Sequence, residues 1–285
     1  MSAIRHEQTG GHGHILVPVS FCLAAMVSIQ LAAALSKPVM AQLGVFGTSL
    51  VRLSFAALIL LIIVRPSFLR YDRSQWYAAF GLGVTMAIMT LCFFSAIETI
   101  PLGMAVAIEF LGPLLVATIY GSGRLRFICP LIAAFGVACL SASGDIWAND
   151  WKGMLFAFGA AFGWGGYIIF MKHAGQKFQG LEGLAVSMIF TALIALPLGA
   201  QELYSGFTPD IFLIAALLAI LSPLVPYALE FFALRRMKTS SFGILLSLEP
   251  ALGATIGFII LGQTLTFVQL TGIALVIIAS IISTR

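Results

Sequence analysis

Three glutamates lie in segments of the chain that are otherwise apolar. Glu109 occurs in AVAIEFLGP, Glu230 in PYALEFF and Glu249 in LLSLEP. An ionisable side chain inside a lipid-embedded segment is costly, so each is a candidate for function. A carboxylate that faces a cavity could hold the ammonium group of an amino acid, or carry a proton in exchange for substrate. In the alternative interpretation, these glutamates are neutral and hydrogen-bonded between helices.

Further polar and aromatic side chains accompany these carboxylates. Gln30, in AAMVSIQLAAALSK, offers two donors and one acceptor, which suits a bound zwitterion or an interhelical hydrogen bond equally well. Trp164 and Tyr167, in FGAAFGWGGYIIF, are candidates for a substrate pocket, although aromatic residues are also common at membrane interfaces. The glycines of the same segment predict close packing of helices.

One arginine and several prolines also interrupt apolar segments. Arg52, in LVRLSF, could bind an anionic group, but we favour a structural role near the outer interface, with its side chain reaching toward water. Pro113, Pro223, Pro226 and Pro250 each free a backbone carbonyl and permit a kink. Freed carbonyls could bind an ammonium group, or the kinks could serve as hinges, and the sequence does not separate these alternatives.

Composition determines which elements position these residues. The chain of 285 residues is 60% hydrophobic and 9% charged, whereas soluble domains carry about 25% charged residues. The solvent for most of this chain is therefore lipid, and its apolar segments have the length of membrane-spanning helices rather than of barrel strands. The predicted helices are 15–35, 44–64, 75–97, 102–120, 127–143, 152–171, 181–199, 209–232, 240–261 and 267–284.

The distribution of basic residues tests this number of helices. With a cytoplasmic N-terminus, 12 of the 15 Lys and Arg residues fall in inside segments, Lys37 and Lys152 fall outside, and Arg52 lies within a helix. Such an excess follows the positive-inside rule, and a missed helix would destroy the alternation. The N-terminal residues have no signal-peptide cleavage site. We therefore expect ten helices, a multi-pass location and both termini in the cytoplasm.

An internal repeat relates the two halves of the chain. Phe94–Pro113 and Phe231–Pro250 align without gaps at an offset of 137 residues. This offset spans five predicted helices, an odd number, so the second copy must enter the membrane from the opposite side. At this offset Glu109 falls three residues before Glu249, nearly one helical turn, so both carboxylates can lie on the equivalent face. We predict a cytoplasmic tail at 1–14 and five-helix repeats at 15–143 and 152–285.

Four blocks of sequence together resemble one transporter family. They are AAMVSIQLAAALSK at 24–37, IPLGMAVAIEFLGP at 100–113, LSPLVPYALEFFAL at 221–234, and SFGILLSLEPALGA at 241–254 with FIILGQTLTFVQL at 258–270. In order along essentially the whole chain, they resemble the threonine/homoserine exporter family, which belongs to the EamA-type transporters of the drug/metabolite transporter superfamily.

The resemblance implies a ten-helix, all-α membrane fold of two inverted five-helix repeats in a bacterial inner membrane. It also implies a central cavity lined mainly by helices 1, 3, 4, 6, 8 and 9, through which amino acids, other small metabolites or drug-like cations pass. Tyr227 falls on one of these helices. The predicted substrate-binding residues, from the polar-residue argument and helix placement, are Gln30, Glu109, Trp164, Tyr167, Tyr227, Glu230 and Glu249.

The resulting prediction is a secondary exporter of threonine- or homoserine-like amino acids, working by alternating access and driven by proton exchange. An uncoupled facilitator, or an exporter of other amino acids, metabolites or drug-like cations, is the alternative. An intramembrane enzyme is disfavoured because the chain lacks two aspartates at membrane depth, a GxSG motif and an HExxH motif. The four cysteines have no metal-ligand spacing, so we expect neither a metal nor another cofactor. The expected partners are a small-molecule substrate, protons and the lipid bilayer, and no basic patch suits nucleic acid.

Overall fold

The structure is a computed structural model that describes residues 13–120, 125–142, 150–206, 208–234, 236, 242 and 245–283. Throughout these residues the regular elements are helices. In chain order they are α1 (Gly13–Leu43), α2 (Val45–Val64), the 3-10 turn η1 (Phe68–Arg70), α3 (Arg73–Thr99), α4 (Leu102–Glu109), α5 (Leu111–Tyr120), α6 (Leu125–Ala142), α7 (Trp151–Lys177), α8 (Glu182–Gly206), α9 (Pro209–Ala219), the π turn η2 (Ile220–Leu224), α10 (Val225–Leu234), α12 (Glu249–Leu261) and α13 (Phe267–Ser283).

Six spans among the described residues are long and apolar enough to cross a membrane: Leu16–Leu43, Val45–Val64, Arg73–Thr99, Leu102–Tyr120, Trp151–Lys177 and Glu182–Tyr204. Four shorter apolar helices accompany them: Ile128–Leu140, Pro209–Leu224, Glu249–Leu261 and Phe267–Ile282. Each coincides with a predicted segment, and the prediction of an all-helical membrane protein is confirmed for the described residues. The predicted start of the ninth helix, residue 240, lies outside them.

Two of the predicted helices are divided in the structure. The segment predicted at 102–120 consists of α4 and α5, which meet at Phe110. The segment predicted at 209–232 consists of α9, η2 and α10. In η2, Ser222 has an extended backbone (φ −159°, ψ 120°). This division has a local cause, because a proline disfavours the helical conformation of the residue before it and Pro223 follows Ser222.

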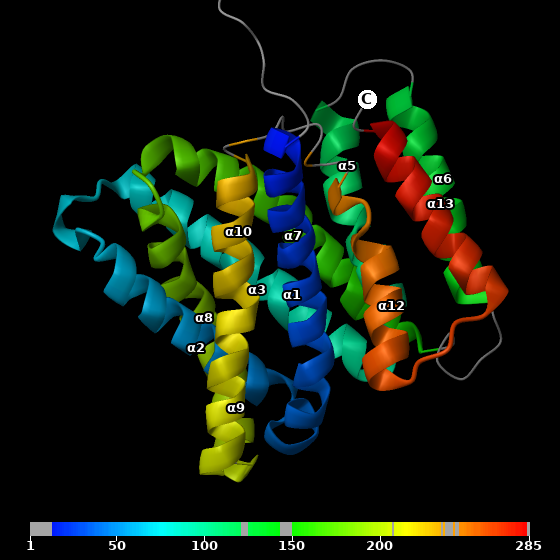
Figure 1. Ribbon diagram of the computed structural model, residues 1–285. Helices are drawn as coiled ribbons and strands as arrows, with labels where there is room; N and C mark the ends of the chain where they lie inside the picture. The colour runs from blue at the N-terminus through cyan, green and yellow to red at the C-terminus, as the bar shows by residue number, and fades with distance from the viewer. Residues whose placement is uncertain are drawn as a thin grey trace, which may run out of the picture.

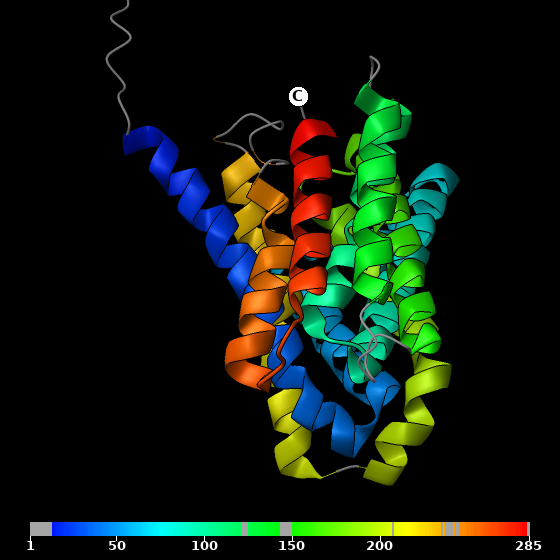
Figure 2. The same ribbon diagram turned by 90° about the vertical axis from the view of Figure 1, so that its right-hand side faces the viewer.

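The helices form a bundle in which segments far apart in sequence pack side by side. α1 packs on α10, α2 on α8, α3 on α7, α4 on α12 and α6 on α13. Figures 1 and 2 show α6 and α13 side by side, and place the first turn of α1 and the last turn of α13 at the same end of the bundle. Each of these five contacts joins a helix before residue 143 to one after residue 150.

Glycines bring several of these helices unusually close. A Cβ on Gly163 of α7 would lie 2.6 Å from the Cα of Met89 on α3, and one on Gly159 would lie 2.9 Å from the Sγ of Cys92. A Cβ on Gly136 of α6 would lie 2.8 Å from the carbonyl oxygen of Gly272 on α13. The close packing predicted from the glycines of α7 is therefore confirmed, and it is the usual way in which helices associate in lipid.

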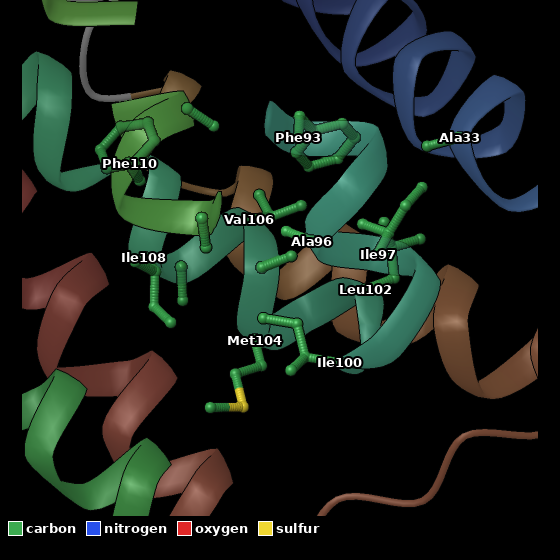
Figure 3. Packing of buried hydrophobic residues seen from close by; sticks show 14 of the residues in the cluster. Ala33, Phe93, Ala96, Ile97, Ile100, Leu102, Met104, Val106, Ile108 and Phe110 are labelled. Carbon is green, nitrogen blue, oxygen red and sulfur yellow. The ribbon is translucent and has the colours of Figure 1, made fainter. Parts of the chain in front are cut away.

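The largest apolar cluster surrounds α4, whose eight residues are all buried. Figure 3 shows Met104, Val106 and Ile108 of α4 together with Phe93 and Ile97 of α3 in this cluster. Glu109 is the last residue of α4, so the most enclosed helix of the bundle ends in a carboxylate.

Candidate functional site

The three glutamates of the apolar segments are neighbours in the structure. Glu109 ends α4 and Glu249 begins α12, with 8% and 4% of their surfaces exposed. Glu230 of α10 is partly buried. Glu249 interacts electrostatically with both Glu230 and Glu109. None of the three forms a hydrogen bond with another described residue, so their oxygens remain available to a ligand or a proton.

Helices α1 and α3 border this carboxylate group, which we define as Glu109, Glu230 and Glu249. Cys22 of α1 interacts electrostatically with Glu230 and Glu249, and Cys92 of α3 does so with Glu109. The group therefore lies where α1, α3, α4, α10 and α12 meet. It does not amount to a metal site, since no three His, Cys, Asp or Glu side chains among the described residues are placed to hold an ion.

Gln30 of α1 approaches the same helix as Glu249. A Cβ on Gly253, one turn beyond Glu249 in α12, would lie 3.4 Å from the Oε1 of Gln30. Gln30 is 1% exposed, and its buried Oε1 accepts no hydrogen bond in the part of the chain that the structure describes. A buried acceptor without a donor is costly. This position therefore suits a donor such as an ammonium group or a protonated carboxyl.

The aromatic candidates Trp164 and Tyr167 pack against different apolar clusters in the structure. Trp164 packs edge-on against Phe110, with 5.4 Å between the ring centroids. Phe110 directly follows Glu109 in the sequence. Tyr167 instead packs against the second apolar cluster, which contains Leu82 and Met86 of α3. Tyr227 lies on α10, but its side chain is outside the described set. Trp164 thus packs against the residue that follows Glu109, and Tyr167 packs in a different cluster.

The break between α9 and α10 is held by side chains from two other helices. Ser28 Oγ of α1 donates a hydrogen bond to the carbonyl oxygen of Leu221, at 2.7 Å. Arg52 Nη2 of α2 donates to the carbonyl oxygen of Ser222, at 3.0 Å. A kinked helix leaves carbonyls without their usual N–H partners, and these two side chains supply replacements.

Arg52 differs from the sequence-based expectation. We expected its side chain to reach toward water at the outer interface, but only 4% of the residue is exposed. Its guanidinium carbon lies 4.4 Å from the ring centroid of Phe94. That expectation is wrong because the residue turns inward, toward a carbonyl that the helix break has freed.

Comparison with known proteins places the chain in a family. A sequence model of the EamA-like transporter family matches residues 151–285. "Threonine/homoserine exporter RhtA" of Escherichia coli K12 is 36% identical over 272 residues, which cover 95% of this chain and 92% of that protein. The protein of the same name from Salmonella typhimurium LT2 has the same identity and coverage. The chain belongs to the EamA-like transporter family.

Two further similarities are weaker. An "Uncharacterized transporter" of Clostridium kluyveri is 26% identical over 139 residues, 48% of this EamA-like chain and 45% of that protein. One solved crystal structure superposes with a TM-score of 0.59 at 18% sequence identity, covering 93% of this chain and 97% of the other. This second similarity concerns the fold alone. With its apolar spans and transporter relatives, the EamA-like chain is a multi-pass membrane protein.

Sequence reasoning missed how this EamA-like protein uses its helix break. Pro223 and Pro226 were expected to permit a kink and to free backbone carbonyls. The pattern did not show that Ser28 and Arg52, about 170 to 193 residues away in the chain, bind the freed carbonyls. The available signal was the coincidence of an intramembrane arginine with a double proline, but only the packing of α1 and α2 against η2 joins them.

Two open hollows lie apart from the carboxylate group. One, of about 630 Å³, is lined by Leu50, Leu196, Ala200, Leu203 and Tyr204. The other, of about 370 Å³, is lined by Ile169, Phe170, Lys172, His173 and Gln176. Neither contains a predicted site residue. We base the candidate site on the buried polar groups, because both hollows are open and neither is lined by a buried polar side chain.

Proposed function

We propose that this protein exports small amino acids of the threonine and homoserine type across a bacterial inner membrane, by alternating access coupled to protons. The observation that carries the proposal is the carboxylate group: Glu109, Glu230 and Glu249 come from both halves of the chain, and Glu249 interacts electrostatically with the other two. The substrate class is inferred from relatives that are named threonine/homoserine exporters and match along 92% of their length.

The chemistry of the site supports this proposal. A carboxylate enclosed by apolar helices gains stability either by taking a proton or by binding a cation. The ammonium group of an amino acid and a proton would therefore compete for the same oxygens, and this competition couples their movement. Gln30 Oε1, buried without a donor among the described residues, is a further acceptor for the ammonium group.

We also propose that ten helices cross the membrane as two inverted repeats, 15–143 and 152–285. The repeat offset of 137 residues maps α3, Arg73–Thr99, onto residues 210–236, which is nearly the extent of α9, η2 and α10 together. Under the same mapping, the contact of α3 with α7 corresponds to the contact of α10 with α1. The contacts of α2 with α8 and of α6 with α13 each join a helix to its own counterpart. This pairing supports a two-fold relation between the halves.

Both termini are proposed to be cytoplasmic, with residues 1–14 as a short tail. The first turn of α1 and the last turn of α13 lie at one end of the bundle, as an even number of crossings requires (Figures 1 and 2). The excess of Lys and Arg in the segments assigned to the inside supports the cytoplasm as that side.

Transport by purified protein in liposomes tests the proposed function. We expect Glu249→Gln and Glu109→Gln each to reduce proton-driven threonine transport by about a hundredfold, since an amide neither ionises nor takes up a proton. Glu98→Gln is the matched control, because Glu98 is exposed near the end of α3 and apart from the carboxylate group. Unchanged transport in both site variants, with protein that elutes as the wild type does, would contradict the carboxylate role.

An imposed pH gradient separates the proposal from an uncoupled facilitator. A proton-coupled exporter accumulates threonine against its concentration gradient when the pH gradient is applied and stops when an ionophore removes it. A facilitator equilibrates threonine at the same rate in both conditions. If threonine accumulation does not respond to the pH gradient, transport is not coupled to protons. The assignment of the protein as a transporter would still hold.

A further inference from the structure

Arg52 is a buried cation whose hydrogen bonds are incomplete. The residue is 4% exposed, and among the described residues only the carbonyl oxygen of Ser222 accepts from it, through Nη2. The Nε and Nη1 nitrogens are fully buried and donate to no described residue. Nor does any described carboxylate form an ion pair with this guanidinium.

Such an arrangement is energetically unfavourable without an anion. A guanidinium group stays protonated in proteins, and a buried charge that lacks a partner is strongly destabilising relative to a paired one. A carbonyl oxygen and the face of Phe94, 4.4 Å away, offset only part of that cost. The remaining donors need an acceptor that carries negative charge.

The position of Arg52 in the fold fits a ligand rather than a structural counter-ion. It lies at the break where α9 ends and the ten-residue helix α10 begins, and the N-terminus of a helix carries partial positive charge. Pro223 and Pro226 have no N–H groups, so the break offers fewer backbone donors than an ordinary helix N-terminus, and Arg52 adds its own. Broken helices near the middle of a membrane are where transporters commonly bind their substrates.

We propose that Arg52 binds the negatively charged carboxylate of the transported substrate, through charge-assisted hydrogen bonds from Nε and Nη1. This inference rests on the proposed function, since it takes the carboxylate from an amino acid. The two charged ends of a zwitterion then have separate receptors in the protein: a guanidinium for the carboxylate, and the group of Glu109, Glu230 and Glu249 for the ammonium.

Ligands that differ only at the carboxylate test the role of Arg52. Affinities of purified protein for L-threonine and L-threoninol, which lacks the carboxylate, are measured by thermal shift. We expect the wild type to prefer threonine, and Arg52→Met to bind threonine on the order of 30-fold more weakly, with no preference remaining. Arg52→Lys, which keeps the charge, restores part of the preference.

Ser28→Ala controls for loosening of the break. Ser28 binds the adjacent carbonyl of Leu221 but carries no charge, so this variant keeps the preference for threonine even where both affinities fall. The inference is overturned if Arg52→Met lowers the affinity for both ligands equally, as a purely structural residue would, or if the preference survives.

A probe without an ammonium group separates this inference from the proposed function. If the wild type binds no amino acid, the amino-acid assignment fails, and sodium propionate is then compared with sodium chloride. Stabilisation by propionate in the wild type and not in Arg52→Met keeps a carboxylate site at Arg52. If propionate does not stabilise the wild type, the protein has no carboxylate-binding site at Arg52.

Discussion

Helix α3 and the segment α9–η2–α10 occupy equivalent positions in the proposed repeats, yet one is continuous and the other is broken. The continuous helix has Met86 and Met89 where the broken segment has Pro223 and Pro226. Since the surrounding contacts correspond, these two substitutions account for the difference locally. One copy of the repeat is therefore a continuous helix, and the other offers carbonyls to side chains of neighbouring helices.

The helices that pack on α3 and on the broken segment also differ in how they make contact. α7 packs on α3 through Gly159 and Gly163, so that backbones approach closely and leave no space. On the other side, α1 and α2 contact the broken segment through the hydrogen bonds of Ser28 and Arg52. Close packing through glycines holds the backbones of α3 and α7 at a fixed distance. Hydrogen bonds to the carbonyls of the break, in contrast, can exchange partners. We infer that movement during transport takes place at the break and not at the interface of α3 with α7.

The largest expected effect is on the packing of α3 against α7. Gly163→Ala places a methyl group 2.6 Å from the Cα of Met89, and such overpacking costs about 1 to 3 kcal/mol. We expect a lower unfolding temperature and less folded protein after purification in detergent. Gly175→Ala, in the same helix with no heavy atom within 4 Å of the added Cβ, is the control and gains up to about 1 kcal/mol. Equal unfolding temperatures for both variants would show that the interface is not tight.

Making the broken segment resemble α3 should affect transport more than stability. Pro223→Ala restores a backbone N–H and removes the restriction on Ser222, so we expect the break to close partly. Threonine transport in liposomes then falls about tenfold, while the unfolding temperature stays the same or rises. Pro197→Ala, in the continuous helix α8, should leave transport within about twofold. Wild-type transport by Pro223→Ala would mean that the break is not used.

A smaller effect is expected at Ser28. Ser28→Ala leaves the carbonyl of Leu221 without this donor, which costs about 1 kcal/mol. Ser36→Ala is the matched control in the same helix, because Ser36 Oγ donates to Ala32 O, a carbonyl of its own helix. Its removal should change stability by less than about 0.5 kcal/mol. Denaturation followed by tryptophan fluorescence measures both, and equal losses would show that the break does not depend on α1.

The weakest expected effect concerns the end of the α3–α7 interface. Asp150 caps α7 by accepting from Gly153 N and Lys152 N, and Thr99 of α3 also hydrogen-bonds its carboxylate. The hydrogen bond from Gly153 N is the main reason that the pKa of Asp150 lies below its usual value. Asp150→Ala should cost about 1 kcal/mol at pH 7.

The pH dependence of that loss follows from the sign of the pKa shift. A carboxyl whose pKa is lower in the folded state stabilises the fold above its unfolded pKa, about 3.9, and this contribution disappears as the pH falls through the folded value. Unfolding temperatures of the wild type and Asp150→Ala should therefore differ at pH 7 and converge below about pH 4. A constant difference across that range would rule out the charged cap.

Helix positions were largely predictable, because an apolar segment long enough to cross lipid must hydrogen-bond its own backbone as a helix. The functional contacts were less so. Glu109 and Glu249 were expected on equivalent faces from the repeat offset, and in the structure Glu249 interacts electrostatically with Glu109. Trp164 and Tyr167, three residues apart, were expected together, yet they pack in different clusters because α3, α4 and α8 surround α7 on several sides.

The sequence by itself determined that the chain is a helical membrane protein with costly carboxylates at membrane depth, since composition and segment length leave lipid as its solvent. It also indicated where a helix can break, because proline acts on its immediate neighbours, although α8 continues through Pro197. Only the tertiary structure decided what binds that break. Arg52 lies on α2, and nothing in its local sequence indicates that α2 packs where Ser222 exposes a carbonyl. Local rules place the elements, whereas the partners of buried polar groups depend on which helices meet.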